Sequence, residues 1–421
     1  MNEHTLVAWR ALMDRGTKCI ADERYRDAAD CFSQALSLAM ELDVPVILAF
    51  TIRLLSTARC KLGDLELAEE GFKEAAAICE RLNNAKGLAE AWAGLANVAM
   101  AKELPQAALE WYERSIEIYP ASSPPLRLGM LYSDLGQAYA ALKLWTQAKT
   151  AFQKACNLCR RYQYPRGEAE LLVLMGEVSY RQGEKDEAVN LIKQACRIFA
   201  QLAEGNLLAD ALQYLAFLYY DQDKIQEAFQ CQQRAIVLWL KLGLDLEASE
   251  GSYFLSKIAQ SLGTIEEAES GLQTSISLYP RQDLGLAFRY QSLAGLALAC
   301  LDFGRAEECY RKAAALFAEC GERDKLGEVY EALAFLAEIQ GFEDEACEYH
   351  RKSIVEFDGR GHLAIEAMMS LAQLQEKRGR WLEALQHYWQ ALHLARKGQV
   401  ETERIESSIQ GVSRKLRRKS K

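Results

Sequence analysis

Cysteines and histidines are the first residues of this chain whose spacing could bind a metal or transfer electrons. Cys156 and Cys159 form the only Cys-x-x-Cys of the sequence, and no second pair follows at a zinc-site spacing. The other ten of the twelve cysteines are scattered singly, and no two of the five histidines lie four residues apart. We therefore expect no metal, no cofactor, and small buried or half-buried cysteines typical of a reducing compartment.

Paired carboxylates are the second candidate for chemistry. Glu69-Glu70 and Glu307-Glu308 could share general acid and base work. Both pairs lie in segments with helical periodicity, where neighbouring acids usually form a solvated face. The sequence also has no Gly-x-x-x-x-Gly-Lys-Ser/Thr, Gly-x-Gly-x-x-Gly, Gly-x-Ser-x-Gly or His-Glu-x-x-His motif. We predict no catalytic residues and a protein that is not an enzyme.

The elements that carry these residues are helical by composition. The 421 residues include only seven prolines and no linker or low-complexity stretch, and they are rich in residues that lose little side-chain freedom in a helix. No apolar run approaches the length of a membrane span. The N-terminal residues Met1 to His4 lack the basic and apolar regions of a secretory signal. These features predict an all-helical, cytoplasmic chain.

A repeated Ala-x-x-x-large-x-x-small set gives the chain its period. The leading alanines are Ala28, Ala68, Ala108, Ala148, Ala188, Ala228, Ala268, Ala306, Ala346 and Ala384. Their step is 40 residues as far as Ala268, and then 38, 40 and 38. Small residues at this spacing allow two helices to approach closely, while the large residue fills the gap opposite. Gln232 and His350 depart from the pattern, because they occupy the large position, where Phe or Tyr is usual.

Each of these second helices is preceded by a first helix and a tight turn. Trp92-x-x-x-Ala96-x-x-Ala99 is a typical first-helix pattern. Glycines that can end a helix at positive φ mark the turns. These turn glycines are Gly63, Gly183, Gly263, Gly304, Gly341 and Gly379. Pro120 and Pro280 follow second helices, which a proline would end.

These positions resemble the tetratricopeptide repeat family, and the 40-residue unit is similar to the long repeat of kinesin light chain. The resemblance covers residues 6–397. It implies an all-α, right-handed superhelical solenoid of ten helical hairpins. Residues 399–421 break the pattern, and Gln399 to Leu416 can form one more amphipathic helix that caps the last apolar face.

In this family the first helices line a concave groove, and the resemblance implies that positions 2, 5, 9, 12 and 13 of each first helix face it. The first four repeats then present Arg10, Arg53 and Lys61 against Glu90. Repeats five to ten present eleven acids, namely Glu170, Glu177, Asp210, Asp221, Glu250, Asp302, Glu328, Glu331, Glu338, Glu366 and Glu376. They are opposed by Arg181, Lys257 and Lys377. The second half of the groove is therefore expected to be acidic.

We expect a partner to bind this acidic half, where aromatic residues fall among the acids. The expected site residues are Glu177, Tyr180, Phe217, Tyr220, Asp221, Tyr253, Glu328, Glu331, Phe335 and Glu338. Carboxylates and aromatic rings together suit a basic or mixed apolar/basic protein segment. Two alternatives stay open: the rings could fill gaps between hairpins, and the acids could serve the solubility of a chain with net charge −9.

A second mode of ligand binding that occurs in this family is not expected here. Some members hold a C-terminal carboxylate with paired lysines and asparagines in three adjacent repeats. The corresponding positions are Met13, Thr17, Arg53, Thr57, Ala93 and Asn97. At most two of the required residue types are present, so the resemblance does not extend to this clamp.

The last eight residues contain six basic ones, and they form a second candidate site. The basic tail comprises Arg414, Lys415, Arg417, Arg418 and Lys419. It could bind nucleic acid, an anionic membrane or the acidic groove of the same chain, or it could be a disordered solubilising end.

Taken together, these features predict a non-enzymatic scaffold or adaptor that is monomeric or weakly self-associating. One alternative is a peptide-gated regulatory protein, although no separate output module precedes residue 6. Another is a non-catalytic subunit that positions a separate enzyme.

Overall fold

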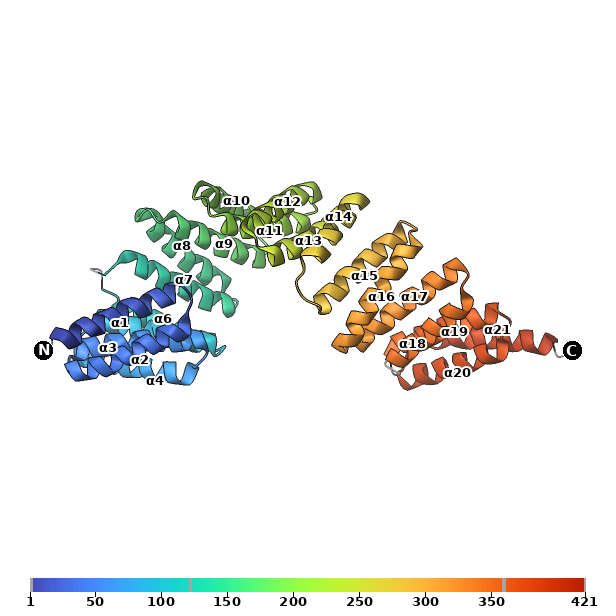
Figure 1. Cartoon of the computed structure of the whole chain (residues 1–421), viewed down its shortest axis with the longest axis horizontal. Coiled ribbons are helices and arrows are strands. Elements are labelled where there is room, and N and C mark those ends of the chain that lie inside the picture. The colour runs from blue at the N-terminus through green and yellow to red at the C-terminus, as the bar shows by residue number, and fades with distance from the viewer. Residues whose placement is uncertain (1–2, 121–122, 358–360, 420–421) are drawn as a thin grey trace. The chain divides into compact units, whose positions relative to one another are not determined.

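The computed structural model describes residues 3–120, 123–357 and 361–419. Within these ranges the chain forms twenty-one α-helices and no strand (Figure 1). The prediction of an all-α repeat fold is therefore confirmed, while the right-handed sense of the superhelix stays a prediction. No described helix is both long and apolar enough to cross a membrane.

The chain divides into two compact units, Met1–Gln222 and Asp223–Lys421. Unit 1 contains α1 (Glu3–Ala21), α2 (Tyr25–Leu42), α3 (Pro45–Leu62), α4 (Leu65–Arg81), α5 (Ala85–Ala101), α6 (Pro105–Ile118), α7 (Pro125–Ala141), α8 (Trp145–Arg161), α9 (Pro165–Arg181), α10 (Lys185–Gln201) and α11 (Gly205–Asp221). Unit 2 contains α12 (Ile225–Leu242), α13 (Asp245–Leu262), α14 (Ile265–Leu278), α15 (Leu284–Ala299), α16 (Phe303–Cys320), α17 (Arg323–Gln340), α18 (Glu343–Phe357), α19 (Gly361–Lys377), α20 (Trp381–Lys397) and α21 (Glu403–Lys419). The boundary falls between α11 and α12, inside the predicted sixth hairpin, and the predicted limits 6–397 and 399–421 stay a prediction.

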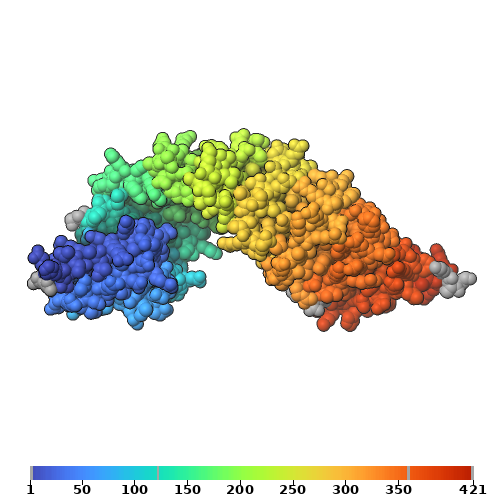
Figure 2. All heavy atoms as spheres, in the orientation of Figure 1, coloured from blue at the N-terminus to red at the C-terminus, as the bar shows by residue number. Residues whose placement is uncertain are grey.

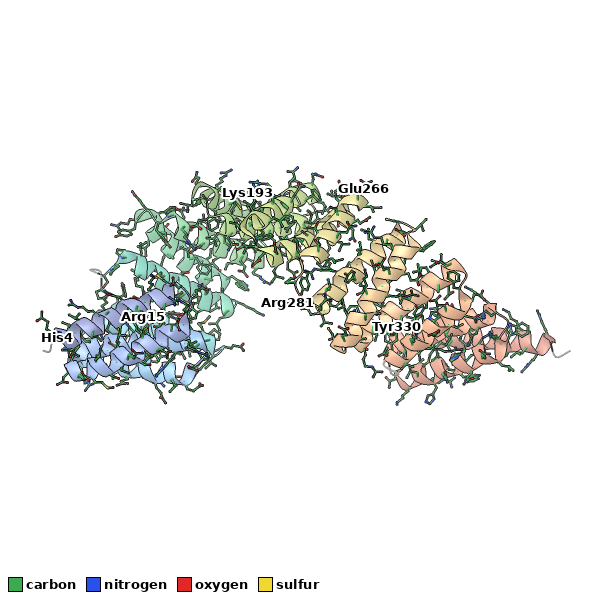
Figure 3. The ribbon with its side chains drawn as sticks, viewed as in Figure 1. His4, Arg15, Lys193, Glu266, Arg281 and Tyr330 are labelled. Atoms are coloured by element: carbon green, nitrogen blue, oxygen red, sulfur yellow. The ribbon has the colours of Figure 1, made fainter. Side chains whose placement is uncertain are left out.

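Consecutive helices pack as pairs within each unit. In unit 1 the pairs run from α1 with α2 to α9 with α10, and in unit 2 from α13 with α14 to α19 with α20. Tyr330 of α17, labelled in Figure 3, illustrates such a pair, because its ring stacks on Tyr349 of α18 with centroids 6.2 Å apart. Side chains fill the spaces between the ribbons of each unit (Figure 2).

The repeated Ala-x-x-x-large-x-x-small set forms the centre of these pairs. All ten leading alanines are fully buried, and the residue at the large position of every copy is also buried, including Gln232 and His350. The rings of Phe32 and Phe152 lie directly against Gly16 and Gly136 of the first helices of their own pairs. The second helices therefore pack as the sequence predicts.

Helix ends agree with the predicted turns with one exception. Five of the six predicted turn glycines have positive φ, but Gly304 lies inside α16. The left-handed residue of that turn is Leu301, with φ 61°. The sequence did not reveal it, because leucine is rarely found in this conformation. Pro120 and Pro280 follow second helices as predicted, and the residue before each proline is extended.

Helix α21 covers the end of unit 2. Ile405, Ile409 and Val412 are buried against the apolar face of α20. The predicted capping helix therefore exists, but it begins at Glu403 rather than Gln399, because Gln399 adopts φ 54°. The residues of the tail up to Lys419 are helical, which contradicts the interpretation of a disordered end.

The cysteines are mostly placed as expected. Cys156 and Cys159 are both buried on α8, on one face of the helix. Cys300 and Cys320 are exposed, so the prediction of buried or half-buried cysteines is wrong at these two positions.

Replacement of Gly136 tests the close approach of the paired helices. A Cβ at this position would lie 2.5 Å from Cε1 of Phe152, so the ring must move, whereas a Cβ at Gly129 of the same helix would find its nearest neighbour at 3.6 Å. We expect Gly136→Ala to lower the free energy of unfolding by about 1–3 kcal/mol, the usual cost of overpacking. Gly129→Ala should be neutral or stabilising by up to about 1 kcal/mol. Urea unfolding followed by circular dichroism measures both, and equal effects would contradict the packing described.

Candidate functional site

A hollow on unit 1 lies over the first helices of the four leading pairs. It has a volume of about 650 Å³, and residues of α1, α3, α5 and α7 line most of it. The polar lining residues are Thr17, Arg53, Thr57, Lys61, Glu90, Asn97, Arg127 and Asp134. A smaller hollow of about 290 Å³ shares Arg53 and Glu90 and adds Lys86. The two hollows therefore lie on either side of one ion pair.

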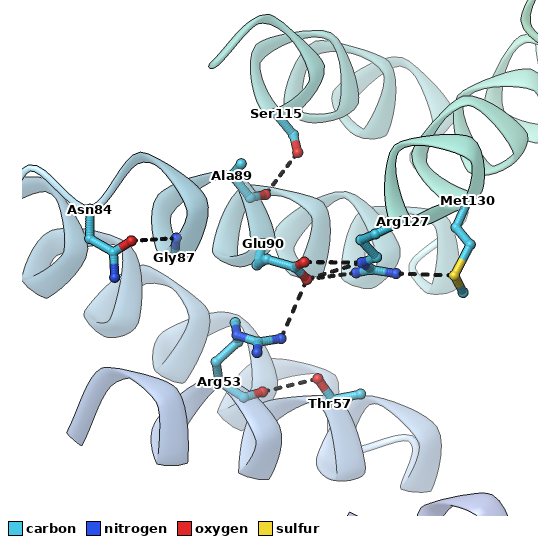
Figure 4. Close-up of polar contacts among 9 residues, drawn as sticks. All are labelled: Arg53, Thr57, Asn84, Gly87, Ala89, Glu90, Ser115, Arg127 and Met130. Carbon is cyan, nitrogen blue, oxygen red and sulfur yellow. Dashed lines mark hydrogen bonds and ion pairs between the residues drawn. The ribbon is translucent and has the colours of Figure 1, made fainter. Parts of the chain in front are cut away.

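This ion pair is part of a triad between three first helices (Figure 4). Nη2 of Arg127 lies 2.9 Å from Oε2 of Glu90, and Nη1 of Arg53 lies 3.5 Å from the same oxygen. The side chain of Glu90 is only 11% exposed. Burial by itself raises the pKa of Glu90, but the hydrogen bond and charge of Arg127 and the charge of Arg53 outweigh it and lower the pKa. Burial also lowers the pKa of Arg53. One carboxylate thus serves two guanidinium groups.

Asp134 and Lys61 face the same hollow without such partners. In the described part of the chain neither side chain has a hydrogen-bond or ion-pair partner, and Asp134 is half-buried. Burial raises the pKa of Asp134 to about 6, although the charges of Arg127 and Lys61 oppose the shift. Its carboxyl group therefore titrates close to neutral pH.

Arg127 and Asp134 were missed by the sequence analysis. The five groove positions of the family pattern skip both residues. A wider view of α7 would have found them, since Arg127, Met130 and Asp134 are spaced i, i+3 and i+7 and so lie on one helical face.

In unit 1 the structure brings three of the predicted residues together on α9 and α11. The ring centroids of Tyr180 and Phe217 lie 5.5 Å apart, and Tyr214, which the sequence analysis missed, stacks on Phe217 at 6.2 Å. Phe217 remains 38% exposed. Glu177 lies one turn before Tyr180, and its side chain is 53% exposed although it pairs with Arg181 at 3.9 Å. We call Glu177, Tyr180, Tyr214 and Phe217 the aromatic–acidic patch.

Tyr220 and Asp221 lie at the end of α11, beyond this patch. Oδ2 of Asp221 accepts Nζ of Lys185 at 2.6 Å, and the side chain of Asp221 is 31% exposed. Tyr220 is half-buried. Asp221 is therefore tied to the start of α10.

In unit 2 the predicted residues do not form one cluster. The hydroxyl of Tyr253 lies 3.1 Å from that of Ser292, and Lys257 lies over the Tyr253 ring at 4.5 Å. Phe335 projects from α17 with 55% exposure. Glu328 of the same helix pairs with Lys325 at 2.8 Å. Phe335 thus offers an exposed ring, whereas Tyr253 is engaged by its neighbours.

Glu331 and Glu338 bind a buried histidine. Nδ1 of His350 lies 3.0 Å from Glu331 and Nε2 lies 3.1 Å from Glu338, and the imidazole is 3% exposed. Burial alone would lower the pKa of His350, but the hydrogen bonds and charges of the two carboxylates outweigh it and raise the pKa. These two acids therefore help to hold α18 on α17.

The other acids of the predicted groove also have partners inside the protein. Glu170 pairs with Arg166, Glu250 with Arg289, Glu366 with Arg404 and Glu376 with Lys415. Asp302 is not on a first helix at all: it is the N-cap of α16 and accepts the backbone N–H of Arg305, so its assignment to the groove is wrong. The cations come from positions that the groove pattern skips, and they reduce the expected excess of free acid.

The basic tail is docked within unit 2. Nζ of Lys415 lies 2.7 Å from Oε1 of Glu376 on α19. Arg414, Arg417 and Arg418 are exposed on α21, which also contains Lys419. One of the tail charges, that of Lys415, is therefore paired with an acid of the predicted groove.

Comparisons with known proteins agree with this repeat architecture. Two family models described as tetratricopeptide repeat match residues 48–121 and 127–201, and residues 208–242. A search of curated proteins finds no match. The C-terminal part of a TPR repeat-containing protein from Cytophaga hutchinsonii is 15% identical, with a TM-score of 0.51, and the alignment covers 65% of this chain and 97% of that one. At this identity the likeness shows the fold alone.

Two further solved structures are similar at lower scores. The apo form of the quorum sensor NprR from B. thuringiensis is 15% identical, with a TM-score of 0.49, and the alignment covers 83% of this chain and 98% of that one. The TPR-like repeats of a kinesin light chain from Podosopora anserina are 18% identical, with a TM-score of 0.43, and cover 48% of this chain and 98% of their own.

Glu90→Gln tests whether the triad is a stabilising element of unit 1. Removal of the carboxylate leaves two guanidinium groups together in a partly buried site, so we expect the free energy of unfolding to fall by about 3 kcal/mol. Glu308→Gln is the matched control, because Glu308 pairs with Lys312 in an exposed i,i+4 geometry, and it should change the value by no more than about 0.5 kcal/mol. Chemical unfolding of both variants gives the comparison. Similar losses of unfolding free energy would show that the triad stabilises unit 1 no more than an exposed ion pair does.

The pair of carboxylates around His350 predicts a pH-dependent stability of unit 2. Since the folded-state pKa lies above the ordinary value of about 6.5, the stabilisation is complete below that value and is lost as pH rises through the folded-state pKa. We expect wild type to exceed His350→Gln in unfolding free energy by more at about pH 5.5 than at about pH 8.5. Urea midpoints at both pH values measure the difference, and an equal or reversed difference would contradict a charged imidazole.

Proposed function

We propose that the chain is a non-enzymatic adaptor, because residues 48–121, 127–201 and 208–242 match tetratricopeptide repeats, a class of repeat that mediates protein–protein interaction. A segment of another protein binds to exposed side chains of its first helices. The aromatic–acidic patch of unit 1 is the primary contact, and the segment is basic or mixed apolar and basic.

The observation that carries this proposal is the exposed aromatic cluster of α9 and α11. The stacked rings of Tyr214 and Phe217 hold each other in place, yet Phe217 keeps 38% of its surface exposed. Tyr180 packs edge-on against the Phe217 ring, with 75° between the ring planes, and so also helps to hold Phe217 in place. Aromatic side chains held in place lose little entropy on binding and are enriched among the residues that dominate interface energies.

The negative charge beside the aromatic cluster indicates that the partner segment is positively charged. Glu177 is 53% exposed, and its contact to Arg181 at 3.9 Å is long and solvated. An exposed pair of this kind contributes little to stability, so its carboxylate can exchange Arg181 for a cation of the ligand at small cost. A lysine or arginine of the segment would also gain on the order of 1 kcal/mol over an aromatic ring. Within unit 2, Phe335 with Glu328, Glu331 and Glu338 offers a similar but looser combination.

Selection of peptides on the immobilised protein tests this proposal. We expect the enriched sequences to combine Lys or Arg with large apolar residues. A labelled peptide of that type should bind Phe217→Ala at least about tenfold more weakly than wild type, which corresponds to about 1.4 kcal/mol. Glu177→Lys should weaken it by a similar factor, because it places a like charge beside the ligand. Fluorescence polarisation gives the affinities.

Tyr162→Ala is the matched control, since Tyr162 is 43% exposed at the end of α8 and makes no contact with the patch rings. It should bind the peptide as wild type does. Enrichment of acidic peptides only, or equal losses in all three variants, would overturn the assignment of this patch.

A further inference from the structure

We propose that one face of unit 2, formed by α20 and α21, binds single-stranded nucleic acid. Arginine side chains of α21 bind its phosphates, and the exposed indole of Trp389 on α20 stacks on an unpaired base. This inference goes beyond the proposed function, because the ligand is not a protein and the face shares no residue with the aromatic–acidic patch. The residues of this α20–α21 face are Gln386, Trp389, Gln390, Gln410, Arg414, Arg417 and Arg418.

The ion pairs of α21 fix its direction relative to α19 and α20. Nη1 of Arg404 lies 3.7 Å from Oε2 of Glu366, in the first half of α19, and Nζ of Lys415 lies 2.7 Å from Oε1 of Glu376, near the end of α19. Helix α21 therefore runs parallel to α19. Because α20 runs back from the end of α19, α21 is antiparallel to α20, and the basic end of α21 lies beside the first half of α20.

Trp389 borders the basic end of α21. Arg396 of α20 pairs with Glu406 of α21 at 2.9 Å, and Trp389 precedes Arg396 by seven residues, which is two turns on nearly the same side of the helix. In an antiparallel pair, the position two turns earlier on α20 lies level with the position two turns later on α21, which is Ser413, next to Arg414. The indole is 54% exposed. An aromatic ring open to solvent therefore lies beside the arginines.

The arginines of α21 form a stripe with no acid among them. No Asp or Glu follows Glu406 in the sequence, whereas Arg414, Arg417 and Arg418 are spaced i, i+3 and i+4 and are exposed. One helical turn, about 6 Å along the axis, separates Arg414 from Arg418. Charges also follow one another closely along a nucleic acid strand, and guanidinium groups bind phosphate through two parallel hydrogen bonds. The stripe therefore fits a phosphate backbone.

The surroundings of the arginines favour nucleic acid over an anionic membrane. An amphipathic helix that binds a membrane inserts its apolar face, but in α21 that face, with Ile409 and Val412, is already buried against α20. The other exposed side chains of the α20–α21 face include three amides, those of Gln386, Gln390 and Gln410. Amides gain nothing from lipid chains, whereas they both donate to and accept from the edges of bases.

An exposed indole beside phosphate-binding arginines favours a single strand over a duplex. The bases of a duplex are stacked on each other, so only an unpaired base can lie on Trp389. Such stacking tolerates any sequence, because every base has a π-face. The expected ligand is thus a flexible single strand that is bound without strong sequence preference.

Fluorescence polarisation with a labelled oligothymidine of about 12 nucleotides tests this face, since single-strand sites span about 4–16 nucleotides. We expect Trp389→Ala to weaken binding at least about fivefold, the usual loss for one stacked base, and to leave the salt dependence unchanged. Arg414→Gln/Arg418→Gln should lower the slope of log Kd against log salt concentration by about 1.4, which is about 0.7 for each phosphate contact. With the duplex form of the probe, Trp389→Ala should have no effect, because no base is free to stack.

Two control variants carry matched changes on other surfaces. Arg26→Gln/Arg281→Gln removes the same charge from exposed positions of α2 and of the link between α14 and α15, where Figure 3 labels Arg281. Tyr162→Ala removes an exposed ring at the end of α8. Both should bind the oligonucleotide as wild type does, and circular dichroism checks that all four variants are folded.

Three results would overturn the inference. The first is that the probe does not bind at low salt, or binds Trp389→Ala as it binds wild type. The second is displacement of the probe by polyglutamate as effectively as by unlabelled oligothymidine, which would show that the face recognises charge alone. The third is co-sedimentation of the protein with phosphatidylserine vesicles in place of probe binding, which would assign the face to a membrane.

Discussion

The close approach of two helices within each pair is the constraint on which the structure depends. Alanine at the leading position of the second helix leaves room for the first helix, and a large side chain one turn later fills the remaining gap. Where the large residue is phenylalanine, as at Phe32 and Phe152, a glycine on the first helix, Gly16 or Gly136, accepts the ring. Because every pair repeats this arrangement, one local rule builds a long chain from contacts that are close in sequence.

The two copies that depart from the rule show how strongly it acts. Gln232 and His350 stay buried although both are polar, so each needs hydrogen-bond partners. Gln232 donates to the backbone oxygen of Gly251, and His350 binds Glu331 and Glu338. Two acids that a groove pattern would assign to a ligand are thereby engaged in holding a helix pair together. A polar residue in the core thus changes the role of residues on the surface above it.

Charge on the first helices is arranged by neighbours rather than by composition. The chain has a net charge of −9, yet its acids in the second half meet cations from adjacent helices, as Glu376 meets Lys415 of α21. In unit 1 two cations share one acid, because the carboxylate of Glu90 pairs with both Arg53 and Arg127. Two surfaces of different character result: an aromatic one with an acidic edge, and a hollow with excess positive charge. Both lie on first helices.

The sequence by itself determined the helix pairs, the buried positions and most helix ends. These follow from the hydrophobic periodicity and from the positions of small residues, glycine and proline. Such signals act within one repeat and can be read directly from the sequence. It did not determine which charged side chains meet. Glu90 and Arg127 are 37 residues apart, and the partner of each acid depends on how neighbouring repeats stack. It also missed Leu301 and the division between α11 and α12, since no residue type marks either one. Tertiary structure decided these features, because contacts between repeats are set by side-chain positions in space, whereas the repeat pattern is set along one helix.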